Sequence, residues 1–193
     1  MSTFFHFVDR LSDCQGEERA RIEAEIWERF GVERSLLSLD MSQFSLTVRR
    51  SGILPYLALI RRMQKLTAPI VEEHGGEVIK YEADNLFASF RNPVDAVHAA
   101  VAINQAIASG GERFEVAIGI DHGRFILIQG EDCWGDTVNV ACKLGEDVAR
   151  PGEILLTQAA AGHLGGAYPM REQRVSVSGL EIEVYAIDYP AAR

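Results

Sequence analysis

Hydrophobic residues recur along this chain at two periods, one typical of helices and one typical of strands. Helical spacing predicts helices over residues 17–30, 51–73, 93–109 and 135–148, with a short helix at 158–163. In the first helix, isoleucine and phenylalanine repeat every four residues between charged positions. In the second, the positions expected to face inwards are Leu54, Leu57, Ile60, Met63 and Ile70.

Short apolar runs between these helices predict strands. They cover residues 35–40, 77–82, 85–90, 113–120, 124–129 and 153–157, and a last hairpin lies near 171–188. The β-α-β-β-α-β order with antiparallel hairpins predicts an α+β fold, a ferredoxin-like antiparallel sheet with helices on one face. Residues 1–34 are expected to form a helical extension that either caps the domain or carries a dimer contact. Residues 35–193 form the main domain.

Composition narrows the class of protein. The chain has 193 residues, of which 47% are hydrophobic and 24% charged, as in a single globular domain. The formal net charge of −9 does not favour nucleic acid or an anionic membrane as a partner. No apolar run approaches the roughly 20 residues of a membrane helix, so we expect a cytoplasmic protein. Three scattered cysteines form neither a disulfide framework nor a zinc motif.

Two aspartates occupy positions suited to metal chemistry. Asp40 ends an apolar run and precedes a small polar turn, and Asp84 lies where two strand-like runs meet. Taken singly, Asp40 could be a helix N-cap and Asp84 a turn residue. Two carboxylates from neighbouring β elements can also hold two divalent cations over a triphosphate. Residues 42–45 lead towards a helix, where free backbone N–H groups suit phosphate oxygens.

From about residue 35 to residue 188 the chain resembles the catalytic domain of class III adenylate and guanylate cyclases. Four segments in the family's order carry the resemblance. They are Asp40-Met-Ser-Gln-Phe44-Ser45, Gly75-Gly-Glu-Val-Ile-Lys80-Tyr-Glu-Ala83-Asp84, Ile118-Gly-Ile-Asp121-His-Gly123-Arg124 and Asp132-Cys-Trp134-Gly135-Asp-Thr-Val-Asn139-Val-Ala-Cys-Lys143. The resemblance implies that residues 35–193 form a nucleotidyl cyclase-like catalytic domain, active as a homodimer with its site at the interface.

The resemblance also implies a metal and phosphate site. Asp40 and Asp84, with the Met41 carbonyl as a further ligand, would hold two divalent cations, Mg²⁺ or Mn²⁺. Phe44 and Ser45 would lie against the substrate. The substrate implied is ATP, with other nucleoside triphosphates as alternatives.

The remaining implied roles concern the base, the ribose and the phosphates. Lys80 would donate to the purine ring and Asp132 would accept from the exocyclic amine, a polarity that suits adenine. Asn139 would orient the ribose, and Arg124 would contact the terminal phosphates. Lys143 would stabilise charge in the transition state. The family has Asp40, Asp84 and Arg124 on one chain, and Lys80, Asp132, Asn139 and Lys143 on the other.

Three departures from the family pattern bear on activity. Lys143 stands where arginine is usual, Ala83 stands where glycine is usual, and the lysine expected before the last strand is missing. Losing a cationic donor of this kind lowers a rate on the order of 10²–10³-fold. The prediction is therefore an adenylate cyclase that turns over slowly. The alternatives are a degenerate module that binds nucleotide or divalent cation, and a cyclase for another nucleoside triphosphate.

Overall fold

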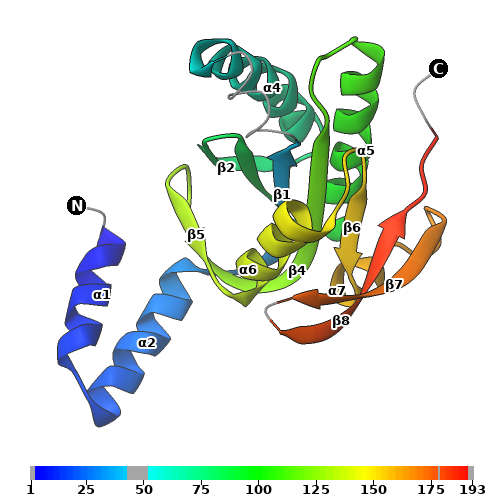
Figure 1. Ribbon diagram of the computed structural model, residues 1–193. Helices are drawn as coiled ribbons and strands as arrows, with labels where there is room; N and C mark the ends of the chain where they lie inside the picture. The colour runs from blue at the N-terminus through cyan, green and yellow to red at the C-terminus, as the bar shows by residue number, and fades with distance from the viewer. Residues whose placement is uncertain (1–2, 43–51, 178, 191–193) are drawn as a thin grey trace.

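A central mixed sheet organises the computed structural model, which describes residues 3–42, 52–177 and 179–190 (Figure 1). Its hydrogen-bonded order is β2-β3-β1-β4-β6-β8-β7, and β5 pairs with β4 beside this path. The strands are β1 (Gly31–Met41), β2 (Glu77–Glu82), β3 (Asn85–Phe90), β4 (Val116–Ile128), β5 (Asp132–Trp134), β6 (Ile154–Thr157), β7 (Met170–Val177) and β8 (Leu180–Ile187).

Helices cover both faces of this sheet. They are α1 (Thr3–Asp13), α2 (Gly16–Phe30), α4 (Ile53–Glu73), α5 (Pro93–Ser109), α6 (Asp136–Lys143), the π-helical turn η1 (Leu144–Val148) and α7 (Gln158–Ala161). The expected α+β fold is confirmed. Two details differ from the prediction of an antiparallel sheet with helices on one face. β4 and β6 run parallel, and α6 with η1 lies on the face opposite α4 and α5.

Side chains alternate along β1, and this alternation explains how the two faces of the sheet are packed. Leu37 and Leu39 point into the core shared with α4 and α5, whereas Leu36 packs with Phe125 and Ala141 on the α6 face. β1 is antiparallel to both β3 and β4, so it lies in the middle of the sheet and is buried on both sides. A carboxylate at the end of β1 is therefore held by a rigid element.

On the α6 face, helix and sheet touch backbone to backbone. A Cβ atom added at Gly119 of β4 would lie 2.2 Å from the Ala141 carbonyl oxygen. A Cβ atom at Gly145 of η1 would lie 2.9 Å from the Ser38 carbonyl oxygen. Only glycine allows these approaches, which bring α6 and η1 against the strands that carry the predicted site.

Several elements differ from the sequence prediction. The buried face of α4 is formed by Tyr56, Ile60, Met63, Thr67 and Val71. Leu54 and Leu57, predicted to face inwards, are 75% and 49% exposed. The predicted break between residues 120 and 124 is absent, because β4 continues from Val116 to Ile128. Helix α1 was not predicted.

Helices α1 and α2 precede the sheet and pack on its β4–β5 hairpin (Figure 1). Phe4, Phe7, Ile22 and Ile26 form a cluster with Ile126 of β4. Phe4 also stacks on Trp134, with ring centroids 5.0 Å apart. In the part of the chain that the structure describes, no helix is both long enough and apolar enough to cross a membrane.

Candidate active site

The two predicted metal-binding aspartates lie at the same edge of the sheet. Asp40 is near the end of β1, and its Cα partner on β3 is Asn85. Asp84 directly precedes Asn85 in the turn between β2 and β3. Ala83 has a positive φ of 51°, the left-handed conformation that explains why glycine suits this position. Sheet pairing thus brings together two carboxylates that are 44 positions apart in sequence.

This end of the sheet concentrates negative charge. Burial, followed by repulsion from the nearby carboxylates of Asp84, Glu146 and Asp147, raises the pKa of Asp40 to about 7. Divalent cations relieve such repulsion and prefer oxygen ligands, so the donor chemistry fits Mg²⁺ or Mn²⁺. Across residues 3–42, 52–177 and 179–190, no group of three or more His, Cys, Asp or Glu side chains is arranged to hold a metal ion. A cation bound here would need further oxygen ligands besides Asp40 and Asp84.

Two side chains of this end were missed by the sequence prediction. The Tyr56 hydroxyl of α4 donates a hydrogen bond of 2.8 Å to Asp84 Oδ2. Glu146 of η1 accepts one of 3.2 Å from Asn85 Nδ2. The family motifs quoted above include neither residue, and a tyrosine on the apolar face of a helix gives no local signal of a polar role.

Lys80 and Asp132, the predicted base-recognition pair, are in direct contact. Lys80 Nζ lies 2.9 Å from Asp132 Oδ1 and 2.7 Å from Glu82 Oε2. It also lies 5.0 Å from the centroid of the Phe87 ring. Burial opposes the charge of Lys80, but the hydrogen bonds to Glu82 and Asp132 outweigh burial and raise its pKa. β2 and β5 therefore place a donor and an acceptor side by side.

Of the remaining predicted residues, Lys143 pairs with a carboxylate of this end, whereas Arg124 lies well away from it along β4. Lys143 Nζ forms an ion pair of 2.8 Å with Asp147, and Asn139 is exposed on α6. Arg124 lies along β4 from Ala117, the partner of Asp40, by seven residues or roughly 20 Å of strand. Its guanidinium carbon lies 4.7 Å from the centroid of a Trp27 ring of α2, and Arg124 itself remains exposed.

The last three predicted residues come at the end of β1 and just after it in the sequence. Met41 is buried at the end of β1, beside Asp40. Phe44 and Ser45, predicted to contact the substrate, lie outside the described residues.

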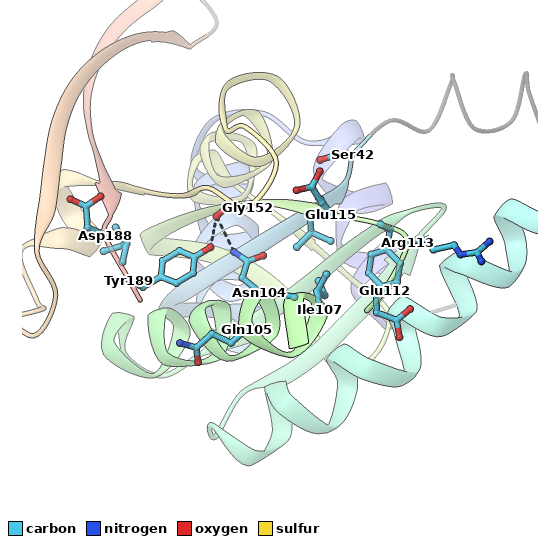
Figure 2. Close-up of a pocket in the computed structure, with 14 residues that line it drawn as sticks. Ser42, Asn104, Gln105, Ile107, Glu112, Arg113, Glu115, Gly152, Asp188 and Tyr189 are labelled. Atoms are coloured by element: carbon cyan, nitrogen blue, oxygen red, sulfur yellow. Dashed lines mark hydrogen bonds between the residues drawn. The ribbon is translucent and has the colours of Figure 1, made fainter. Parts of the chain in front are cut away.

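A cavity of about 740 Å³ opens elsewhere, between α5, the start of β4 and the C-terminal end of β8 (Figure 2). In Figure 2, Asn104 and Tyr189 both donate to the carbonyl oxygen of Gly152 on one side of this cavity. Ser42, the first residue of the segment expected to meet phosphate oxygens, lines it, but none of the described residues predicted to bind metal or base does. The cavity is therefore separate from the carboxylates and from the Lys80–Asp132 pair.

A sequence model described as "Adenylate and Guanylate cyclase catalytic domain" matches residues 69–189, more than half of the chain. The match includes Asp84, Lys80 and Asp132 but begins after Asp40. The chain is also 27% identical, over 138 residues, to a Rhizobium meliloti (strain 1021) protein named "Putative adenylate cyclase 3". The aligned part is 68% of this chain and 23% of that relative, so the chain spans about a quarter of its length.

Solved structures share the fold. An "Adenylate/Guanylate Cyclase/Hydrolase" from Silicibacter pomeroyi is 26% identical, with a TM-score of 0.69 over 83% of this chain and 98% of that one. The guanylate cyclase domain of a Catenaria anguillulae protein, solved with GTP, is 17% identical, with a TM-score of 0.72 over 83% and 97% of the two chains.

Proposed function

We propose that this chain, which belongs to the family of adenylate and guanylate cyclase catalytic domains, converts ATP to 3′,5′-cyclic AMP and pyrophosphate at the interface of a homodimer. The observation that carries the proposal is the meeting of Asp40 and Asp84 at one edge of the sheet, where burial and neighbouring carboxylates raise the pKa of Asp40. The relative named as an adenylate cyclase supports the choice of reaction.

In this proposal Asp40, Asp84 and the Met41 carbonyl hold two divalent cations, Mg²⁺ or Mn²⁺. When bound, such cations lower the pKa of the ribose 3′-hydroxyl and neutralise the leaving pyrophosphate. Backbone N–H groups near Phe44 and Ser45 bind phosphate oxygens. The cluster of carboxylates around Asp40 supports this assignment, because it provides the negative charge that cations would compensate.

The base is bound by the Lys80–Asp132 pair of the other chain. Lys80 donates to a ring nitrogen of adenine and Asp132 accepts from its exocyclic amine. Their separation of 2.9 Å supports a joint role, since one planar base can contact two groups that lie this close. Guanine presents the opposite polarity and would leave buried polar groups unpaired.

Asn139 and Lys143 of that other chain orient the ribose and stabilise charge in the transition state. Arg124 remains a proposed contact for the terminal phosphates, although neither its distance along β4 nor its stacking on Trp27 supports it. Lys143 carries one charge without the two-pronged geometry of arginine, and its ammonium already pairs with Asp147. We therefore expect slow turnover.

A second candidate function follows from the state of the cationic positions. With Lys143 paired and the C-terminal lysine of the family missing, the chain could retain nucleotide or cation binding without turnover. A cyclase for another nucleoside triphosphate is the third candidate, which only the choice of base distinguishes from the first.

One experiment separates these candidates. Purified protein is incubated with each of the four nucleoside triphosphates and Mn²⁺, and products are identified by mass. Cyclic AMP from ATP is expected, together with a loss of several orders of magnitude in Asp84→Ala. Asp13→Ala, which removes an exposed carboxylate at the end of α1, serves as the control. Nucleotide binding without any cyclic product would support the second candidate, and wild-type turnover by Asp84→Ala would refute the metal assignment.

A further inference from the structure

Tyr56 is a buried polar side chain at the carboxylate end of the sheet that the catalytic motifs do not include. It lies in the first turn of α4, is 1% exposed and belongs to the main hydrophobic core. Its hydroxyl donates to Asp84 Oδ2 over 2.8 Å. The sequence match to the cyclase family begins at residue 69, so it does not reach Tyr56.

We propose that Tyr56 is a positioning residue for Asp84, holding carboxylate oxygen Oδ2 so that the other oxygen is presented to a divalent cation. This inference rests on the proposed function, because it assumes that Asp84 is a metal ligand. It adds a residue that the family motifs do not assign.

The packing of α4 fixes where this hydroxyl points. The buried face of α4 lies along the β2–β3 hairpin and meets it at two places. Near the middle of the helix, Thr67 Oγ1 lies 3.0 Å from the Tyr81 hydroxyl of β2. At the start of the helix, Tyr56 reaches Asp84 in the hairpin turn. Two contacts along one helix set both its distance from the hairpin and its angle to it.

The chemistry of a buried phenol explains why tyrosine suits this place. Phenylalanine would fill almost the same volume without needing a hydrogen-bond partner, whereas a buried tyrosine hydroxyl must find one. The buried hydroxyl of Tyr56 meets this need by donating a hydrogen bond to the carboxylate of Asp84.

The turn that carries Asp84 makes such support useful. Ala83 adopts the left-handed conformation, and the Asp84 side chain projects from a two-residue connection between strands. A carboxylate on a turn can rotate about its own bonds unless a partner fixes it. Hydrogen bonds to ligating carboxylates commonly alter metal affinity by about 10–100-fold, because they set the orientation of the ligand.

The test compares two tyrosines that both contact α4. Tyr56→Phe removes the hydroxyl that meets Asp84, and Tyr81→Phe removes the hydroxyl that meets Thr67 and the Gln64 carbonyl. Each variant of the full chain is titrated with Mn²⁺ alone, and free Mn²⁺ is followed by its EPR signal. Turnover of ATP is then measured as a function of Mn²⁺, and thermal unfolding shows that each variant is folded.

The expected result is Mn²⁺ binding about tenfold weaker in Tyr56→Phe and unchanged in Tyr81→Phe, with the same shift in the Mn²⁺ concentration that half-saturates turnover. Equal binding by Tyr56→Phe and wild type would overturn the inference and leave the proposed function intact. Equal weakening in both variants would also overturn it, because general loosening of α4 would then be the cause. If the wild type itself binds no Mn²⁺, the metal assignment of Asp84 fails, and with it both proposals.

Discussion

The two halves of the candidate site satisfy their charges in different ways. Around Asp40, burial and the repulsion from three nearby carboxylates, Asp84, Glu146 and Asp147, raise the pKa of Asp40 to about 7. Around Lys80, a cation contacts two carboxylates, Glu82 and Asp132, and its pKa is raised in the direction that keeps it charged. The first half keeps an excess of negative charge although Lys143 pairs with Asp147, whereas in the second half a cation contacts both carboxylates before any ligand binds.

This difference indicates what each half requires from a ligand. The carboxylate end gains from cations, because they remove a repulsion that already exists in the folded protein. The Lys80–Asp132 pair must give up part of an existing ion pair to contact a base, so it can select among bases but gains less from binding any one of them. Cation binding should therefore supply affinity for the nucleotide, and the Lys80–Asp132 pair should supply specificity for the base.

The largest effect is expected when the carboxylate half is removed from one chain of a dimer and the base-binding half from the other. Asp84→Ala and Lys80→Ala homodimers should each be nearly inactive, since every site lacks one half. Random mixing of the two variants makes about half of the dimers mixed, each with one intact site of two, so about a quarter of wild-type turnover should return. Cyclic AMP production after verified subunit exchange is the measurement. If no activity returns, both halves of each site belong to one chain.

A smaller effect on turnover is expected when the polarity of the Lys80–Asp132 pair is reversed. Combining Lys80→Glu with Asp132→Cys leaves adenine with unmatched polar groups, each costing about 1–3 kcal/mol. The ratio of kcat/KM for ATP to that for GTP should fall by at least about 30-fold. The variant Glu131→Gln, which removes a charge from the neighbouring turn, should leave the ratio unchanged. A double variant with the wild-type ratio would show that this pair does not contact the base.

The raised pKa of Asp40 predicts a dependence of stability on pH in metal-free buffer. The folded-state pKa of about 7 lies above the ordinary value of 3.8, so the folded protein binds a proton that the unfolded chain releases. The contribution is complete below about pH 4 and is lost as the pH rises through 7. Because Asp40 is partly exposed, the loss should be on the order of 1–2 kcal/mol.

Urea unfolding at pH 5 and pH 8 with a chelator measures this change, and Asp40→Asn should reduce it. Glu146, whose pKa is also raised by burial and by Asp147, contributes in the same direction and remains in the variant. Equal pH dependence in the wild type and Asp40→Asn would contradict the assignment of the effect to Asp40.

The smallest predicted effect concerns the turn beside Asp84. Ala83 has a positive φ of 51°, which costs an alanine about 1 kcal/mol relative to glycine. Ala83→Gly should therefore raise the free energy of unfolding by up to about 1 kcal/mol, less the extra entropy of glycine in the unfolded chain. Chemical denaturation measures the gain. A destabilised Ala83→Gly variant would show that the loss of the methyl group outweighs the relief of strain.

Local patterns predicted much of this architecture, including the strand that ends near Asp40 and the hairpin that carries Asp84. They failed where the reason for a residue lies in a distant segment. The predicted strands broke between residues 120 and 124, yet β4 continues through Gly123. Glycine is needed there for a distant contact, because a Cβ atom would lie 2.6 Å from Thr137 Oγ1. Tyr56 contacts Asp84, which is 28 positions away, so no local pattern could identify that role.

The inward face of α4 shows the same limit. Leucine spacing favoured Leu54 and Leu57 as buried positions, but the described structure exposes both and buries Tyr56 between them. At the start of the helix, the contact with Asp84 places the tyrosine inwards, and a hydrophobicity pattern ranks a tyrosine below two leucines. The buried residues of α4 still recur at helical spacing, but on a face that Leu54 and Leu57 do not share.

The backbone contact between the sheet and the α6–η1 segment has a consequence for how this sequence can diverge. Gly119 and Gly145 contact the opposing backbone directly, so any mutation that adds a methyl group at either position forces the two layers apart. Such a shift would move Glu146 and Lys143, although neither glycine needs to touch a substrate. We therefore expect selection to retain both glycines while the residues around them drift. Among relatives that share the fold at 17–26% identity, these two positions should serve as fixed landmarks for aligning new members.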